Sequence, residues 1–195
     1  MLKRKRHERV DESRVGVYLV SAYTVRGAFL TGIDRYAVKS FTYRESWIDG
    51  RVPALGEVFA VECLDYRTLD TVLHLVLRNR PDVAAEWSNE EVARRWLRLN
   101  RAKLRLRDRL DPDRLAATLA NPAEIAKHRS ALASISFYMA YLRQPIGVLA
   151  NEEDGERGFF WEPRFGCRRL PDDPETWRCE LYLPTSRFKL VVDDE

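Results

Sequence analysis

Residues 59–78 read FAVECLDYRTLDTVLHLVLR and contain the clearest structural signal in the chain. Two runs rich in apolar and β-branched residues, Phe59–Leu64 and Thr71–Leu77, lie on either side of a polar link at residues 65–70. Apolar runs of this length separated by a short polar segment are typical of paired strands. The stretch therefore predicts a β-hairpin.

The second predicted strand places a histidine within an apolar run. Side chains at positions i and i+2 of a strand lie on the same face of the sheet. Val72 and His74 are thus expected on one face, with Leu73 and Leu75 on the other. A lone histidine in such a strand is most often a packing residue, and a metal ligand is the alternative.

The remaining pattern predicts four helices and two more strands. A β-rich run predicts the first strand, a capping box starting at Ser88 predicts a helix N-terminus, and proline at a first helical position predicts the last helix. In chain order these elements are a strand at Val15–Tyr23, a helix at Tyr43–Phe59, a helix after Ser88, the longest helix from Asn121 to about Leu149, a strand at Gly158–Phe165, and a helix from Pro174 that ends by Leu183.

This order of elements predicts an α+β sandwich, a central, mainly antiparallel sheet flanked by helices. With 195 residues, 45% of them hydrophobic, the chain is expected to form one domain over residues 14–195 after a basic tail at residues 1–13. No apolar run is long enough to cross a bilayer, and the charged N-terminus lacks an apolar signal segment. A cytoplasmic protein without a membrane partner is therefore expected.

The charges are unevenly distributed along the sequence, although the net charge is only +3. Eight basic residues lie between Arg94 and Arg109, where Asp108 is the single acid. Such a run favours contact with nucleic-acid phosphates, and a solvated helix face is the alternative. Three widely spaced cysteines suggest neither a disulfide framework nor a zinc site. These residues alone do not define a catalytic site.

The hairpin sequence, and above all His-Leu-Val-Leu-Arg at residues 74–78, resembles the metal-binding hairpin of single-tyrosine HUH transposases, specifically the branch of REP-associated tyrosine transposase-like proteins. Further similarity covers most of residues 20–165. The matching patches are Arg26–Leu30, Trp47-Ile48, Glu86–Ser88, Arg94–Trp96, Ile135–Asn151, Asp154-Gly155 and Gly158–Phe165. The resemblance implies an HUH-type sandwich and an enzyme that nicks and rejoins single-stranded or hairpin DNA.

In that family two histidines, separated by one hydrophobic residue, hold a divalent metal such as Mg²⁺ or Mn²⁺ beside the scissile phosphate. A helix-borne tyrosine then attacks the phosphate. The resemblance places the second histidine at His74 and the tyrosine at Tyr182. It also implies DNA contacts by five arginines and leaves a homodimer open. These arginines are Arg26, Arg78, Arg94, Arg95 and Arg98.

This chain departs from the family pattern at the catalytic positions. Val72 stands where the first histidine is expected, and the usual surroundings of the nucleophile are absent around Tyr182. Similarity is poor from Gly166 onward, as in a diverged or truncated copy. We therefore expect a transposase-like DNA-binding protein with impaired cleavage. The alternatives are a catalytically inactive binder of single-stranded or hairpin DNA, and a structural module without a DNA role.

Overall fold

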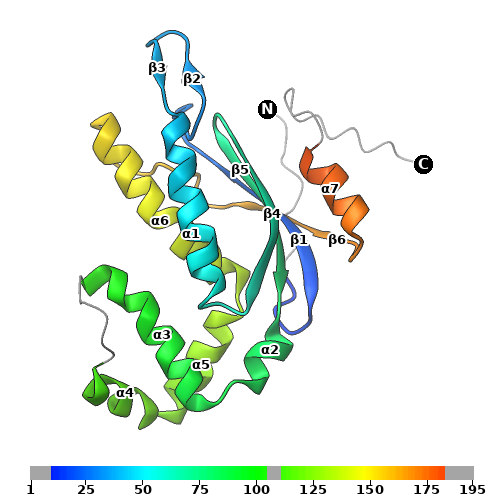
Figure 1. Ribbon diagram of the computed structural model, residues 1–195, viewed down its shortest axis with the longest axis vertical. Coiled ribbons are helices and arrows are strands. Elements are labelled where there is room, and N and C mark those ends of the chain that lie inside the picture. The colour runs from blue at the N-terminus through cyan, green and yellow to red at the C-terminus, as the bar shows by residue number, and fades with distance from the viewer. Residues whose placement is uncertain (1–9, 105–110, 183–195) are drawn as a thin grey trace.

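A four-stranded antiparallel sheet forms the centre of the computed structural model, which describes residues 10–104 and 111–182 (Figure 1). Its strand order is β4-β5-β1-β6, so β5 and β1 are the interior strands. A separate two-stranded ribbon is formed by β2 and β3. The strands are β1 (Gly16–Tyr23), β2 (Ile33–Asp34), β3 (Lys39–Ser40), β4 (Val61–Leu69), β5 (Val72–Asn79) and β6 (Gly166–Leu170).

Helices cover both faces of the sheet, which confirms the predicted α+β sandwich. In Figure 1, α1 and α6 lie on one side of the sheet and α7 lies on the other. The helical elements are η1 (Thr42–Arg44), α1 (Glu45–Gly56), α2 (Pro81–Glu86), α3 (Asn89–Leu104), α4 (Pro112–Leu119), α5 (Pro122–Leu132), α6 (Ile135–Asp154) and α7 (Pro174–Tyr182). None of the helices in the described ranges is both long and apolar enough to cross a membrane.

The predicted hairpin is confirmed as β4 and β5, although its link is shorter than expected. Most of residues 65–70 belong to β4, and only Asp70 and Thr71 separate the two strands. The strand pairing shifts between Cys63 and Asp65, where a bulge interrupts the regular register. The polar residues of β4 can belong to a strand because the hydrogen bonds that pair β4 with β5 join backbone groups and do not depend on the side chains.

Alternation along β5 divides its side chains between two hydrophobic cores. Leu73, Leu75 and Leu77 contribute to the large core beneath α1 and α6, whereas Val76 belongs to a smaller core with α7. By parity, Val72 and His74 share the face of Val76. This result confirms the prediction that Val72 and His74 lie on one face. We call it the α7 face.

The helix predicted at Tyr43–Phe59 is confirmed as the shorter α1. Ile48, Val52 and Leu55 are its buried residues, and their i, i+4, i+7 spacing places them on one stripe. Pro53 lies inside the helix and has no N–H to donate to the preceding turn. The amphipathic stripe therefore outweighs the local cost of this proline, and α1 ends at Gly56, three residues later.

Two other sequence predictions were wrong. The single helix expected from Asn121 to about Leu149 is two helices, α5 and α6, because the Ser134 side chain accepts a hydrogen bond from the Phe137 N–H and starts a new helix. Residues 158–165 do not form a strand. They make one isolated bridge, between Trp161 and Thr24, and the strand follows as β6.

Candidate nucleic-acid interface

His74 lies on the α7 face near the start of β5, an interior strand of the sheet. Its ring is buried, with 2% of its surface exposed, between β4 and β1. His74 Nδ1 lies 2.8 Å from the Ser21 hydroxyl oxygen, and the Tyr23 ring meets the imidazole edge-on at a centroid distance of 6.4 Å. Residues of the first strand thus fix the orientation of this imidazole.

The surroundings of His74 keep its imidazole neutral. Burial and, to a smaller extent, the positive charge of Arg67 together lower the pKa of His74 to about 4. Arg67 lies directly opposite His74 in the register of β4 and β5. At neutral pH the residue is therefore a hydrogen-bonding group without charge.

A row of polar groups crosses the sheet at this level. Arg67 pairs with His74, and His74 pairs with Ser21, so the three residues stand side by side on β4, β5 and β1. Arg168 of β6 pairs with Leu19, whose side chain belongs to the core on the α7 face, and it adds a second guanidinium to that face. The row therefore combines hydrogen-bonding capacity with positive charge.

Val72 makes the neighbouring position apolar. It is buried, with 8% exposed, and pairs with Tyr23 on one side and Leu69 on the other. A valine side chain offers no lone pair to an ion. The position two residues before His74 therefore contributes packing where the family pattern requires a second imidazole.

The donor set around His74 does not fit the divalent metal that the resemblance implies. Within residues 10–104 and 111–182, no three His, Cys, Asp or Glu side chains come together as an ion-binding group. Divalent ions of this class need several oxygen or nitrogen ligands. The Arg67 charge would also oppose a cation beside His74. The described residues around His74 therefore do not form a divalent metal site.

The helix that carries the expected nucleophile lies on the same face as His74. Trp177 and Leu181 of α7 pack in the smaller core with Val17, Leu19 and Val76. Tyr182 follows Leu181 as the last residue of α7, and its side chain lies outside the described part of the chain. The fold thus brings the C-terminal end of α7 and the His74 strand to one side of the sheet.

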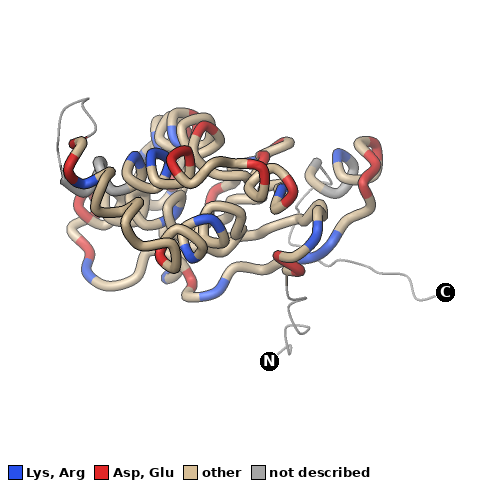
Figure 2. Tube along the Cα trace, turned by 90° about the horizontal axis from the view of Figure 1, so that it is seen from below, with Lys and Arg blue, Asp and Glu red and all other residues tan. Residues whose placement is uncertain are grey.

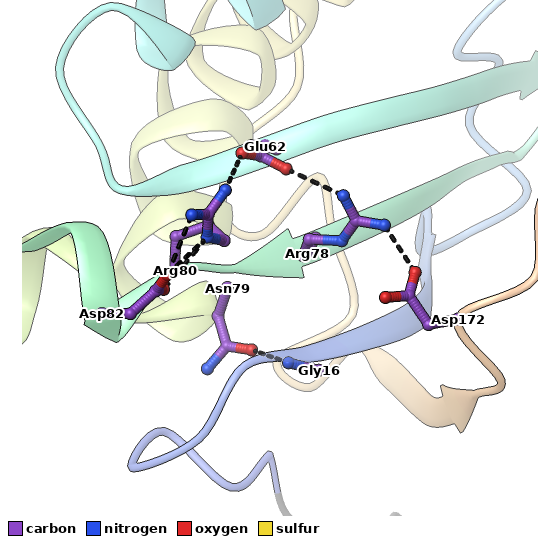
Figure 3. Close-up of polar contacts among 7 residues, drawn as sticks. All are labelled: Gly16, Glu62, Arg78, Asn79, Arg80, Asp82 and Asp172. Atoms are coloured by element: carbon purple, nitrogen blue, oxygen red, sulfur yellow. Dashed lines mark hydrogen bonds and ion pairs between the residues drawn. The ribbon is translucent and has the colours of Figure 1, made fainter.

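Arg78 also lies on the α7 face, but it belongs to a network of ion pairs (Figure 3). Glu62 bridges Arg78 at 3.3 Å and Arg80 at 2.7 Å, and the outer carboxylates are Asp172 beside Arg78 and Asp82 beside Arg80. This network ties β4 and β5 to the segment before α7. Arg78 therefore has a structural role whether or not it meets DNA.

Three of the other arginines implied by the resemblance also bind protein groups. The Arg26 guanidinium donates to the Phe159 carbonyl oxygen at 2.8 Å. Arg94 donates to Glu90 at 2.9 Å, and Arg95 donates to Glu91 at 2.6 Å and stacks on a tryptophan ring. These contacts fasten loops and the first turns of α3, and a DNA role for these residues stays a prediction.

Arg98 differs from the other four because its side chain is exposed and makes no hydrogen bond or ion pair with a described residue. The rest of the basic run from residue 100 onward lies outside the part whose side chains are described. Figure 2 shows acidic and basic residues interspersed over the described helices rather than separated onto two sides. Over the described helices, basic residues are therefore accompanied by acids.

The sequence did not single out Ser21 and Arg67, the two residues that pair with His74, or Arg168 on the same face of the sheet. Arg67 could have been predicted, because pairing the two strands of the hairpin places it opposite His74. The position of Arg168 could not be predicted, because the strand that carries it, β6, was expected several residues earlier in the chain. Comparison with models of protein families and with curated proteins gives no match for this chain.

Proposed function

We propose that this chain is a DNA-binding relative of the single-tyrosine HUH transposases in which metal-dependent cleavage is impaired. One observation supports this proposal most strongly. His74 on an interior strand and the helix ending at Tyr182 lie on the same face of an antiparallel sheet, which is the relative placement that the family mechanism requires.

The side chains on that face also suit a phosphodiester. Arg67 and Arg168 are partly exposed guanidinium groups, and the Ser21 hydroxyl is a hydrogen-bonding group between them. Guanidinium groups bind phosphate oxygens through fixed, charge-assisted hydrogen bonds. The α7 face therefore offers charge complementarity to the backbone of single-stranded or hairpin DNA.

Impaired cleavage follows from the missing ligand. A phosphodiester reaction assisted by a metal gains most from neutralisation of the developing negative charge. With Val72 beside a neutral His74, the described residues provide one imidazole for that purpose. DNA binding is therefore expected to persist although cleavage is impaired, because arginine contacts to phosphate do not require a metal ion.

The direct test is a fluorescence-anisotropy titration of the full chain with single-stranded, hairpin and duplex DNA, each with and without Mn²⁺. We expect tighter binding of the single-stranded or hairpin forms, an affinity that falls with salt, and no dependence on Mn²⁺. Absence of DNA binding at low salt would overturn the proposal. Binding of all three forms with equal affinity would reduce it to nonspecific charge attraction.

Arg98 and Arg95 form a matched pair of variants for this titration. Arg98→Ala removes an exposed charge, so it should weaken DNA binding and reduce the salt dependence while leaving the melting temperature unchanged. Arg95→Ala removes contacts to Glu91 and to the Glu57 carbonyl oxygen, so it should lower the melting temperature. If Arg98→Ala leaves DNA affinity unaltered, α3 does not contribute to the interface.

Residual cleavage is tested by trapping a covalent protein–DNA adduct on a denaturing gel. We expect little or no adduct from the unmodified chain. Any adduct should disappear in Tyr182→Phe, and a persistent adduct would direct attention to Tyr23, which lies beside His74. Strong adduct formation by the unmodified chain would show that the second histidine is dispensable.

A further inference from the structure

The β2–β3 ribbon exposes an unusual group of apolar side chains. Tyr36 at its tip is fully exposed (102%), and Val38 and Ile33 are 87% and 60% exposed. Figure 1 shows the ribbon projecting past the end of the main sheet. Full exposure leaves both faces of the Tyr36 ring open to a ligand.

The ribbon is a defined arm rather than an open loop. The Asp34 carboxylate accepts hydrogen bonds from the backbone N–H groups of Tyr36 at 2.8 Å and Ala37 at 3.1 Å. At its base, the Phe41 N–H donates to the Gly32 carbonyl oxygen at 2.8 Å. A ring presented on such a turn loses little freedom on binding.

The arm is attached to the turn that leads into the His74 strand. Backbone N–H groups of Leu30 and Thr31 donate to the Asp70 carbonyl oxygen. A Cβ atom at Gly32, where φ is +83°, would lie 2.2 Å from the Asp70 carboxylate, so the close approach requires glycine. Asp70 is two residues before Val72, and the arm therefore stands at the His74 end of the sheet.

The chemistry of the tip matches a single-stranded nucleic acid. Arg35 adjoins Tyr36, is exposed, and forms no hydrogen bond or ion pair with a described residue. Lys39 is half exposed and lies 3.6 Å from Asp154. An open aromatic ring beside an unneutralised guanidinium is the combination by which proteins stack an unpaired base and hold its phosphate.

We propose that Tyr36 stacks on an unpaired base of single-stranded DNA while Arg35 contacts the adjoining phosphate. This inference rests on the proposed DNA-binding function and names a contact on an arm separate from the α7 face. Unpaired bases stack on aromatic rings with little sequence preference, so the arm would contribute affinity for single strands over duplex.

The test uses the full chain and a short oligothymidine that carries one 2-aminopurine, whose fluorescence is quenched by stacking. Tyr36→Leu should weaken binding by roughly tenfold and remove the quenching, whereas Tyr36→Phe should retain both. Arg35→Gln should reduce the slope of log affinity against log salt by about 0.7. All three changes are at exposed positions, so the melting temperature should stay constant.

Three outcomes are informative. If the unmodified chain binds the oligonucleotide and Tyr36→Leu binds equally well, the stacking inference is wrong and the proposed function stands. If Tyr36→Leu binds less tightly but retains the quenching, another group stacks on the base, which also overturns the inference. If the unmodified chain does not bind DNA, both proposals fail, and the exposed apolar arm is better explained as a protein-docking site.

Discussion

Acidification from neutral pH to pH 5 should destabilise the folded chain, because His74 is buried as a neutral imidazole. Its pKa is about 4 in the folded chain and 6.5 in the reference state that represents the unfolded chain. Between these values the unfolded chain binds a proton that the folded chain excludes. Stability is therefore lost as pH falls through 6.5, and the linkage relation gives a loss of about 2 kcal/mol at pH 5.

Urea denaturation followed by tryptophan fluorescence at the two pH values measures this loss. His74→Gln should remove most of the pH dependence of the free energy of unfolding. Comparing the two pH values within each variant cancels the pH-independent effect of the substitution on that free energy. His128→Gln is the matched control, since burial also lowers the pKa of His128 but its ring is stacked on Trp96, away from the α7 face. An unchanged pH dependence in His74→Gln would refute the reasoning.

Three further predictions concern stability and metal binding. Arg44→Gln should lower the free energy of unfolding, measured by urea denaturation, by about 3–5 kcal/mol, because the fully buried Arg44 guanidinium pairs with Asp154 at 2.6 Å. Adding Asp154→Asn to the Arg44→Gln chain should recover part of this loss, because it removes the carboxylate left without its partner. Val38→Gly should raise the free energy of unfolding by up to roughly 1 kcal/mol in thermal denaturation, since a β-branched residue at φ +52° is strained and its exposed side chain loses little packing. Val72→His should tighten Mn²⁺ binding in isothermal titration calorimetry by adding a second imidazole on the His74 face, and an unchanged affinity would mean that the charge of Arg67 dominates the site.

The centre of the fold could be predicted because its signals are local and strong. Two apolar runs joined by a short polar link specify a hairpin, and strand alternation then assigns Val72 and His74 to one face. The same alternation could not show how deeply His74 is buried, because its ring contacts Ser21 and Tyr23 of β1, a strand distant in the sequence. That information lies in packing between segments distant in the sequence.

The boundaries that were wrong have identifiable physical causes. Ser134 interrupts an otherwise continuous helical pattern by capping α6, and one serine within an apolar stretch is a weak signal without the backbone geometry. Residues 158–165 contain aromatic side chains for another reason: Phe160 and Trp161 are buried in the large core. The two buried aromatic residues explain part of this composition, whereas Phe159 is exposed, and neither feature requires a strand.

The predicted arginines show why charge along the sequence is an incomplete guide to a binding surface. Arg95 pairs with Glu91, a residue that the sequence assigned to the helix cap. Arg26 binds the backbone of Phe159, a contact between segments far apart in the chain. An i, i+4 acid can be found from the sequence. A carbonyl acceptor supplied by a remote loop cannot.

Among its described side chains, helix α7 packs on the sheet through two large apolar residues. Trp177 and Leu181 are four residues apart and both are buried, while Pro174, Glu175 and Arg178 face solvent. Any helix with two large apolar residues at that spacing would cover the same part of the sheet. Substitutions at its other positions could therefore accumulate without exposing the smaller core, and this side of the sheet would stay covered while the sequence of the segment changed.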